Sequence, residues 1–113
     1  MITLEVGQEA EERALDYLKK HGMKRVAQNY RCRFGEIDII MRDGIYLVFI
    51  EVRARTHTAF GGGLGSITYA KRQKIVKTTA HYLLTNKLYE QYPIRFDAVS
   101  IDGISGKIIW VKD

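Results

Sequence analysis

The 113-residue sequence predicts a single α/β domain in which helices pack on a mixed β-sheet, with the element order αβββαββ. Two segments carry the helical spacing of apolar residues, and strand-like segments fill the intervals after each of them. No internal repeat or low-complexity segment divides the sequence. Because a chain of this length can bury one hydrophobic core without staples, residues 1–113 are expected to form one domain.

The first half of the chain is expected to contain one helix and three strands. Residues 7–21 are amphipathic, with apolar residues at spacings of three and four. Residues 25–33 show a weak strand pattern, whereas residues 36–42 and 45–54 are rich in Ile, Val and Phe. Asp43-Gly44 between the last two segments is a two-residue hairpin signal, so these strands should pair antiparallel.

The second half is expected to add one helix and two strands. Residues 57–65 are glycine-rich and read as a loop. Thr68 can cap a helix that runs to about Asn86. Residues 95–101 and 107–111 are predicted to be the final strands, joined around Asp102-Gly103.

Composition favours a protein of a reducing compartment. The single cysteine, Cys32, excludes an internal disulfide framework and a multi-cysteine metal site. No apolar run approaches the roughly 20 residues that span a bilayer, and the acidic N-terminus lacks the basic-then-apolar order of a signal peptide. A cytoplasmic protein without a membrane partner is therefore expected.

Positive charge is concentrated in two regions of the sequence. The chain has 18 Lys and Arg against 13 Asp and Glu, a net charge of +5, and residues 52–89 contain neither Asp nor Glu. Such one-signed stretches attract polyanions, nucleic acid first; a solvated basic surface without a partner is the alternative. The cations are Lys19, Lys20, Lys24, Arg25, Arg31 and Arg33 in the first region and Arg53, Arg55, Lys71, Arg72, Lys74, Lys77 and Lys87 in the second.

Four charged residues, Glu36, Asp38, Glu51 and Arg53, interrupt the apolar hairpin. The predicted turn places Glu36 opposite Glu51, with Asp38 as a diagonal neighbour roughly 7–8 Å from Glu51. Because residues two apart share a strand face, all four should project from one side of the hairpin. The opposite side would then be the core face, made of Ile37, Ile39, Val48, Ile50 and Val52.

This arrangement suits a divalent metal and a phosphate. Mg²⁺ is usually held by one or two carboxylates, with water and substrate phosphate completing its shell. Asp38 and Glu51 supply such oxygen ligands, and Arg53 on the same face can hold a phosphate. The pattern therefore fits phosphodiester hydrolysis with Mg²⁺ or Mn²⁺. The alternative is an exposed sheet edge where Glu36 or Glu51 forms a salt bridge with Arg53.

Other candidate residues carry weaker signals. Tyr69 can stack on an unpaired base, but packing against the sheet is the favoured interpretation. Arg95 and Asp97 are expected to form a buried structural ion pair, and His81 is expected on the helix surface. Gly61-Gly62-Gly63 lacks the Lys-Ser/Thr ending of a phosphate-binding loop.

Several separated motifs resemble the YraN family of small bacterial proteins. They are "GQEAEERALDYLKKHG", "QNYRCRFGEID", "LVFIEVRART", "FGGGLGSITYAKRQKI" and "IRFDAVSI", and they cover about residues 7–101 in order and spacing. That family is similar to the restriction-endonuclease-like nucleases, including archaeal Holliday-junction resolvases. The resemblance implies a restriction-endonuclease-like fold and a metal-dependent nuclease site.

The nuclease pattern consists of a helical Glu, a strand Asp and a Glu-x-Lys on the next strand. By resemblance, Glu11, Asp38 and Glu51 match the three acids, and Lys71 matches a basic residue at the start of the second helix. Position 53 departs from the pattern because it is Arg rather than Lys. Arginine is always charged and cannot act as a base, although it can bind phosphate or stabilise charge in the transition state.

The residues and the resemblance together predict a Mg²⁺- or Mn²⁺-dependent endonuclease acting on DNA, including branched or damaged DNA. Asp38 and Glu51 would hold metal with help from Glu11, and Arg53 and Lys71 would contact the scissile phosphate. Glu36 would either join the metal site or orient an arginine, Arg33 or Arg53, and the second role is favoured. The predicted nucleic-acid contacts are Arg53, Arg55, Lys71 and Lys74.

Two other functions fit the same sequence. One is a nucleic-acid-binding module that keeps the nuclease fold without cleaving, which Arg53 favours. The other is a protein-interaction adaptor whose charged hairpin face is only structural. By analogy with resolvases, which cut symmetrically, a homodimer is expected.

Overall fold

Seven elements follow one another along the chain in the predicted order αβββαββ. The computed structural model describes residues 3–55 and 68–112. Neither of the two helices in these ranges is long and apolar enough to cross a membrane. The elements are α1 (Thr3–Lys20), β1 (Lys24–Cys32), β2 (Gly35–Asp43), β3 (Tyr46–Arg55), α2 (Tyr69–Thr85), β4 (Ile94–Asp102) and β5 (Ile108–Val111).

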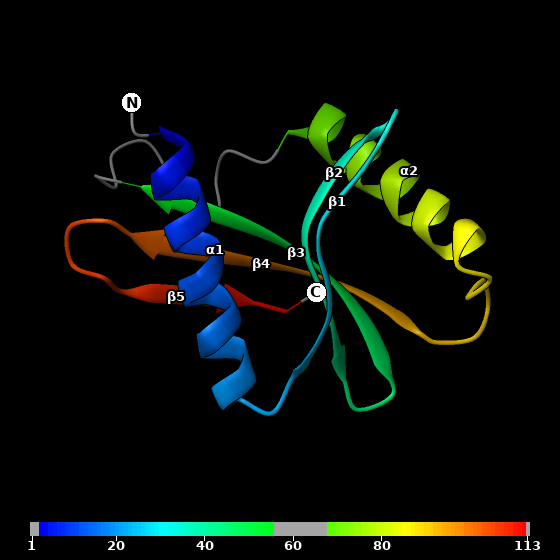
Figure 1. Ribbon diagram of the computed structural model, residues 1–113, viewed down its shortest axis with the longest axis horizontal. Helices are drawn as coiled ribbons and strands as arrows, with labels where there is room; N and C mark the ends of the chain where they lie inside the picture. The colour runs from blue at the N-terminus through cyan, green and yellow to red at the C-terminus, as the bar shows by residue number, and fades with distance from the viewer. Residues whose placement is uncertain (1–2, 56–67, 113) are drawn as a thin grey trace.

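The five strands form one mixed sheet in sequence order, β1-β2-β3-β4-β5. Neighbouring strands are antiparallel except for β3 and β4, which are parallel. The segment between β3 and β4 contains α2, as a parallel connection requires a crossover. Figure 1 shows α1 lying in front of β3, β4 and β5, while α2 runs beside the upper part of the β1–β2 pair.

The β2–β3 hairpin is confirmed, but its register differs from the prediction by two residues. The two-residue loop is Gly44-Ile45 instead of Asp43-Gly44. Gly44 has a φ of +61°, and glycine at the first loop position is the II′ arrangement. A two-residue shift keeps every side chain on its face. The shift does change which residues are opposite each other. When the register is continued one residue beyond the last pair, Ile39 and Ile50, Glu51 faces Asp38 instead of Glu36.

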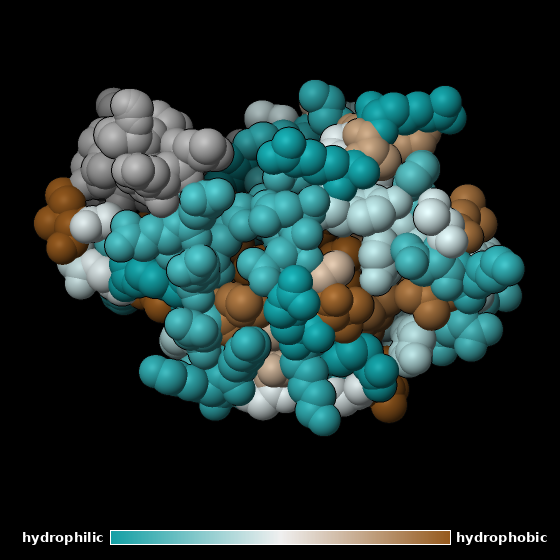
Figure 2. All heavy atoms as spheres, in the orientation of Figure 1, coloured by the Kyte–Doolittle hydropathy of each residue, from teal (hydrophilic) through white to brown (hydrophobic). Residues whose placement is uncertain are grey.

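Both faces of the β2–β3 hairpin are buried, so the prediction of a single core face was wrong. On the mostly hydrophilic face in Figure 2, apolar side chains are visible in the middle of the view, on both sides of the β1–β2 pair. The core on the α1 side includes Ala14, Leu18, Ile39, Met41, Val48, Ile50, Val99 and Ile101. The core on the α2 side is made of Ile37, Ile40, Leu47, Phe49, Tyr82 and Leu83.

The turn between β1 and β2 packs closely on α2. A Cβ added to Gly35 would lie 3.1 Å from Thr78 Oγ1, so only glycine allows this approach. A hydrogen bond joins the Tyr30 hydroxyl to His81 Nδ1, and Tyr30 meets Tyr82 edge-on with centroids 5.0 Å apart. His81 is therefore half-buried between elements, which corrects its predicted place on the helix surface.

The predicted ion pair of Arg95 and Asp97 is confirmed, and it belongs to a larger network. Arg95 donates to both Asp97 oxygens at 2.9 Å and contacts Asp43 Oδ2 at 2.9 Å. Trp110 Nε1–H donates to Asp97 Oδ2 at 2.9 Å. The Asp97 side chain is fully buried and joins β4 to β5, while Arg95 extends the network to Asp43 at the turn end of the β2–β3 hairpin.

Replacing Asp97 by Ala should lower the free energy of unfolding by about 3–5 kcal/mol, because the Arg95 guanidinium would stay buried without its main partner. Urea denaturation monitored by circular dichroism measures this change. Asp16→Ala, at an exposed position on α1, is the control and should cost less than about 0.5 kcal/mol. Equal losses in the two variants would show that the network is not structural.

Candidate functional site

Strand β2 leaves β3 at Asp38. The ladder between the strands ends at the pair Ile39 and Ile50. Beyond it, the Val52 backbone N–H donates to Asp38 Oδ2 at 2.8 Å, so a carboxylate takes the place of a ladder carbonyl. Ile39 packs on the α1 side and Ile37 on the α2 side, although regular alternation would put both on one face. Asp38 therefore occupies an irregular point of β2 between the two cores.

Strand β3 brings Glu51 and Arg53 to the same place. They lie two residues apart, with Arg53 Nη2 3.5 Å from Glu51 Oε2 and side chains 18% and 21% exposed, Arg53 and Glu51 respectively. On the parallel neighbour β4, Ala98 and Ser100 stand beside them. These small neighbours leave space on the sheet face next to the charged pair.

Arg53 has donors without acceptors. Its Nε and Nη2 atoms are buried and donate no hydrogen bond to another described residue, although Nη2 lies within ion-pair distance of Glu51. An unsatisfied buried donor costs roughly 1–3 kcal/mol, and more when the group is charged. The site therefore contains a guanidinium able to gain hydrogen bonds from an anion such as phosphate.

Helix α2 places Lys71 close to the carboxylates. Thr68 caps the helix as predicted, because its hydroxyl accepts from the Lys71 backbone N–H at 3.2 Å. The positive charge of Lys71 acts to lower the pKa of both Asp38 and Glu51. The structure thus brings together four of the predicted residues, Asp38, Glu51, Arg53 and Lys71.

The carboxylates oppose one another electrostatically. Burial, followed by the charge of Asp38, raises the pKa of Glu51 from its ordinary value of 4.5 to about 7. Burial also raises the pKa of Asp38, against the lowering effect of the Val52 hydrogen bond. Arg53 and Lys71 offset this only in part. Desolvated carboxylates held together in this way favour a proton or a cation between them.

Glu11 approaches the same cluster from α1. Burial and the charge of Asp38 raise its pKa to about 7. Asn29 on β1 forms a side-chain hydrogen bond with Glu11 that acts in the opposite direction. Asn29 itself has a φ of +53°, a conformation that Asn tolerates better than most residues. Sequence reasoning missed Asn29, since nothing in a lone strand asparagine marks it as a partner of Glu11.

Glu36 pairs with a different arginine from the two predicted. Its Oε2 lies 3.4 Å from Arg31 Nε, in an exposed pair, so the prediction that it orients Arg33 or Arg53 was wrong. Its charge also raises the pKa of Asp38, Glu51 and Glu11. Glu36 therefore adds negative charge at the margin of the cluster.

The donor set fits a hard divalent cation. Among residues 3–55 and 68–112, no three His, Cys, Asp or Glu side chains are arranged as a metal-binding group. Mg²⁺ needs only one or two carboxylates when water and phosphate complete its shell. Asp38 and Glu51 meet that requirement, and because burial raises the pKa of both carboxyl groups, a bound cation would favour their charged forms.

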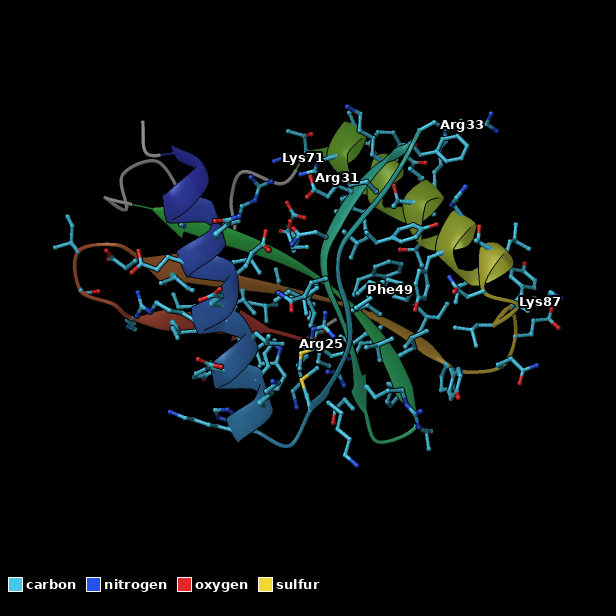
Figure 3. The ribbon with its side chains drawn as sticks, viewed as in Figure 1. Arg25, Arg31, Arg33, Phe49, Lys71 and Lys87 are labelled. Atoms are coloured by element: carbon cyan, nitrogen blue, oxygen red, sulfur yellow. The ribbon has the colours of Figure 1, made fainter. Side chains whose placement is uncertain are left out.

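The other predicted residues lie around the cluster or outside the described ranges. Lys74 is exposed on α2, one helical turn after Lys71. Tyr69 is 72% exposed, so the prediction that it packs against the sheet was wrong. The Arg55 side chain and the glycines Gly61-Gly62-Gly63 lie outside the described part of the chain. Figure 3 shows Arg31 and Lys71 at one end of the molecule, away from Arg25 and Lys87.

These features define a class: an α/β domain with paired carboxylates, an arginine and a lysine gathered where β2 separates from β3. Residues 10–101 match the uncharacterised protein family UPF0102, and the chain belongs to that family. A UPF0102 protein of Legionella pneumophila (strain Corby) is 58% identical over 112 residues, covering 99% of this chain and 95% of that protein.

More distant relatives extend the same family. A UPF0102 protein of Pseudomonas fluorescens is 44% identical over 110 residues, covering 95% of this chain and 89% of that protein. One from Alkalilimnicola ehrlichii is 47% identical over 100 residues, covering 88% of this chain and 79% of that protein. The resemblance to the YraN family is thus confirmed as membership of UPF0102.

The raised pKa of Glu51 predicts a stability that falls with pH. In the metal-free protein, the folded state binds more protons than the unfolded state between pH 4.5 and about 7, so the free energy of unfolding decreases across this window. Glu51→Gln removes the titrating group. It should be more stable than the wild type at pH 8 by on the order of 1–3 kcal/mol, with the gain disappearing below pH 4.5.

Urea denaturation of both proteins in EDTA across this pH range measures the effect. Glu12→Gln, at an exposed position of α1, is the matched control and should follow the wild type. If the free energies of unfolding of Glu51→Gln and the wild type differed by the same amount at all pH values, the raised pKa of Glu51 would be contradicted.

Proposed function

We propose that the protein is a divalent-metal-dependent nuclease that hydrolyses phosphodiester bonds of DNA. The proposal rests mainly on one observation: the desolvated carboxylates Asp38 and Glu51 lie beside Arg53, which has buried N–H donors without a hydrogen-bond partner among the described residues. The carboxylates suit a cation and the arginine suits a phosphate. Lys71 adds a second positive charge beside them. The order αβββαββ is also compatible with a restriction-endonuclease-like fold, which the sequence motifs favour.

Asp38 and Glu51 are the residues that would hold Mg²⁺ or Mn²⁺, with Glu11 assisting from α1. When bound, such an ion supplies positive charge to the phosphate and lowers the pKa of water beside it. Asp38 is held in place by the Val52 N–H at 2.8 Å. Glu51 is steadied by Arg53 at 3.5 Å. Both ligands are thus fixed by partners on β3 before substrate arrives.

Arg53 and Lys71 have different tasks from a catalytic base. Arg53 cannot release its proton at neutral pH, so it would bind the scissile phosphate and stabilise charge in the transition state. Lys71 would contact the same phosphate from the start of α2. Glu11, whose pKa burial and the charge of Asp38 raise to about 7, would have to lose its proton to assist in holding the metal.

Cations at the same end of the molecule would extend the contact to neighbouring phosphates. Arg31 is 73% exposed, and Figure 3 shows Arg33 at the tip of the β1–β2 pair. Lys74 lies further along α2. Phosphate contacts of this type position a nucleic acid without reading its sequence, which fits DNA recognised by shape, such as branched or damaged DNA. A homodimer is proposed by analogy with resolvases, which cut symmetrically, and a cytoplasmic location is proposed from the single cysteine of the sequence.

A nucleic-acid-binding module without cleavage is the second candidate function. The observation that favours it is Arg53, which stands where the nuclease pattern has Lys. Such a module would keep the basic surface and bind in EDTA. Its affinity would fall steeply with salt because phosphate contacts release counterions.

Metal-dependent cleavage tests the proposal. Wild-type protein should cut labelled single-stranded, duplex, flap or four-way-junction DNA with Mn²⁺ or Mg²⁺ and not with EDTA. Asp38→Asn should reduce the rate at least about 100-fold, since it removes a ligand charge, while DNA binding is retained. Asp16→Asn, on the exposed side of α1, should cut like the wild type. Binding without cutting on every substrate would favour the module, and equal cutting by wild type and Asp38→Asn would contradict the site.

For the cleavage rate, a positive charge at position 53 should matter more than the ability of that side chain to accept a proton. Arg53→Lys should keep cleavage within about 10-fold of the wild type, whereas Arg53→Met should lose at least about 100-fold, as expected for removal of a charge that stabilises the transition state. Single-turnover cleavage rates measure this. Equal rates for wild type and Arg53→Met would show that the guanidinium does not act on the phosphate.

A further inference from the structure

A cavity of about 730 Å³ adjoins the carboxylate cluster. Glu51 is one of its lining residues, so the cavity adjoins the candidate site. Helix α2 packs mainly on β1 and β2, and on the same side of the sheet β4 and β5 border the cavity. Its volume lies within the roughly 300–1,000 Å³ of ligand-binding clefts. A metal ion and one phosphate would not explain a cavity of this size.

The strand side of the cavity combines small and apolar side chains with the carboxylates Glu51 and Asp97. The strand registers place Glu51 beside Ala98, and Ala98 beside Val111. Phe96 lies two residues before Ala98 on the same face and also lines the cavity. Val111 is 46% exposed. A planar ring could rest on this surface within reach of the carboxylates.

The wall of the cavity combines apolar and cationic side chains of α2. Arg72, Ile75 and Val76 line it, and Val76 is 49% exposed. Arg72 makes no ion pair with another residue of the ranges 3–55 and 68–112. Tyr69 precedes Arg72 by three residues on the same side of the helix and is 72% exposed. The wall itself therefore offers a cation and apolar contacts. Tyr69 does not line the cavity, but its exposed ring lies beside the wall on the same side of the helix.

These features match the chemistry of an unpaired nucleotide. Aromatic stacking and a cation beside an apolar surface are the common means of binding single strands without sequence preference. In a duplex, the faces of the bases are already stacked on their neighbours, so Tyr69 and the surface around Ala98 could not reach them. We propose, on the basis of the proposed nuclease function, that this cavity binds unpaired nucleotides next to the scissile phosphate. The preferred substrates are then single strands, or duplexes with unpaired flaps.

The test compares single-stranded and duplex binding of the full-length protein in EDTA. Fluorescence anisotropy is measured with a fluorescein-labelled oligothymidine of about 12 nucleotides, within the usual site size, and with a hairpin duplex of matched length. Val76→Glu places a negative charge in the cavity, and Tyr69→Ala removes the stacking ring. The matched controls are Leu84→Glu and Tyr89→Ala, at positions 64% and 57% exposed that do not line the cavity.

Val76→Glu in the cavity and Tyr69→Ala beside it should each bind the single strand about 5- to 10-fold more weakly, the size expected for one lost stacking contact. Their duplex affinity should change less than about 2-fold. Tyr69→Phe should bind like the wild type, which separates loss of the ring from loss of the fold. The two controls should leave both affinities unchanged.

Three results would overturn the proposal: unchanged single-strand affinity in Val76→Glu and Tyr69→Ala, equal losses for single strand and duplex, or wild-type protein that binds neither oligonucleotide. A change from dimer to monomer in Val76→Glu, seen by light scattering, would also overturn it by assigning the cavity to a second copy of the chain. In each case, loss of cleavage in Asp38→Asn still decides the nuclease function separately.

Discussion

The hydrogen bond from the Val52 N–H to Asp38 Oδ2, at 2.8 Å, is the interaction on which the candidate site depends. It satisfies a backbone donor at the point where β2 leaves β3, and a buried donor there would otherwise be costly. It also fixes a carboxylate between the two cores. Without this exchange of a carbonyl for a carboxylate, β2 could continue its ladder with β3 and the space around Glu51 would be closed by the strand.

The site is electrostatically strained, and the strain follows from its position. Asp38, Glu51 and Glu11 converge from β2, β3 and α1, and burial raises the pKa of each. The Arg53 guanidinium has buried N–H donors that make no hydrogen bond with the described residues. A purely structural ion-pair cluster would satisfy these groups, as the Arg95–Asp97–Trp110 network does on the same sheet. The contrast between a satisfied and an unsatisfied network within one fold favours a ligand-binding role for the second.

Local sequence signals predicted every helix and strand, because turn residues and apolar periodicity mark most of them clearly, although the pattern over residues 25–33 is weak. The hairpin register was less predictable, since Asp43-Gly44 and Gly44-Ile45 are both two-residue loops and only packing distinguishes them. Asp38 and Glu51 were found because carboxylates in an apolar hairpin are conspicuous, and Glu11 only through family resemblance. The Glu11–Asn29 contact, the exposure of Tyr69 and the cavity beside Ala98 depend on how distant elements pack, which no local pattern records.

Calorimetric titration of the metal-free protein with Mn²⁺ tests directly whether the carboxylate cluster is a cation site. Metal ligands must lose their protons, and Glu51 and Glu11 hold theirs up to about pH 7. Titrations in buffers of different ionisation enthalpy give the number of protons released per ion. Net release at about pH 6.5 that falls towards zero at about pH 9 would agree with a metal displacing protons from these groups. No Mn²⁺ binding, or binding with equal proton release at both pH values, would contradict it.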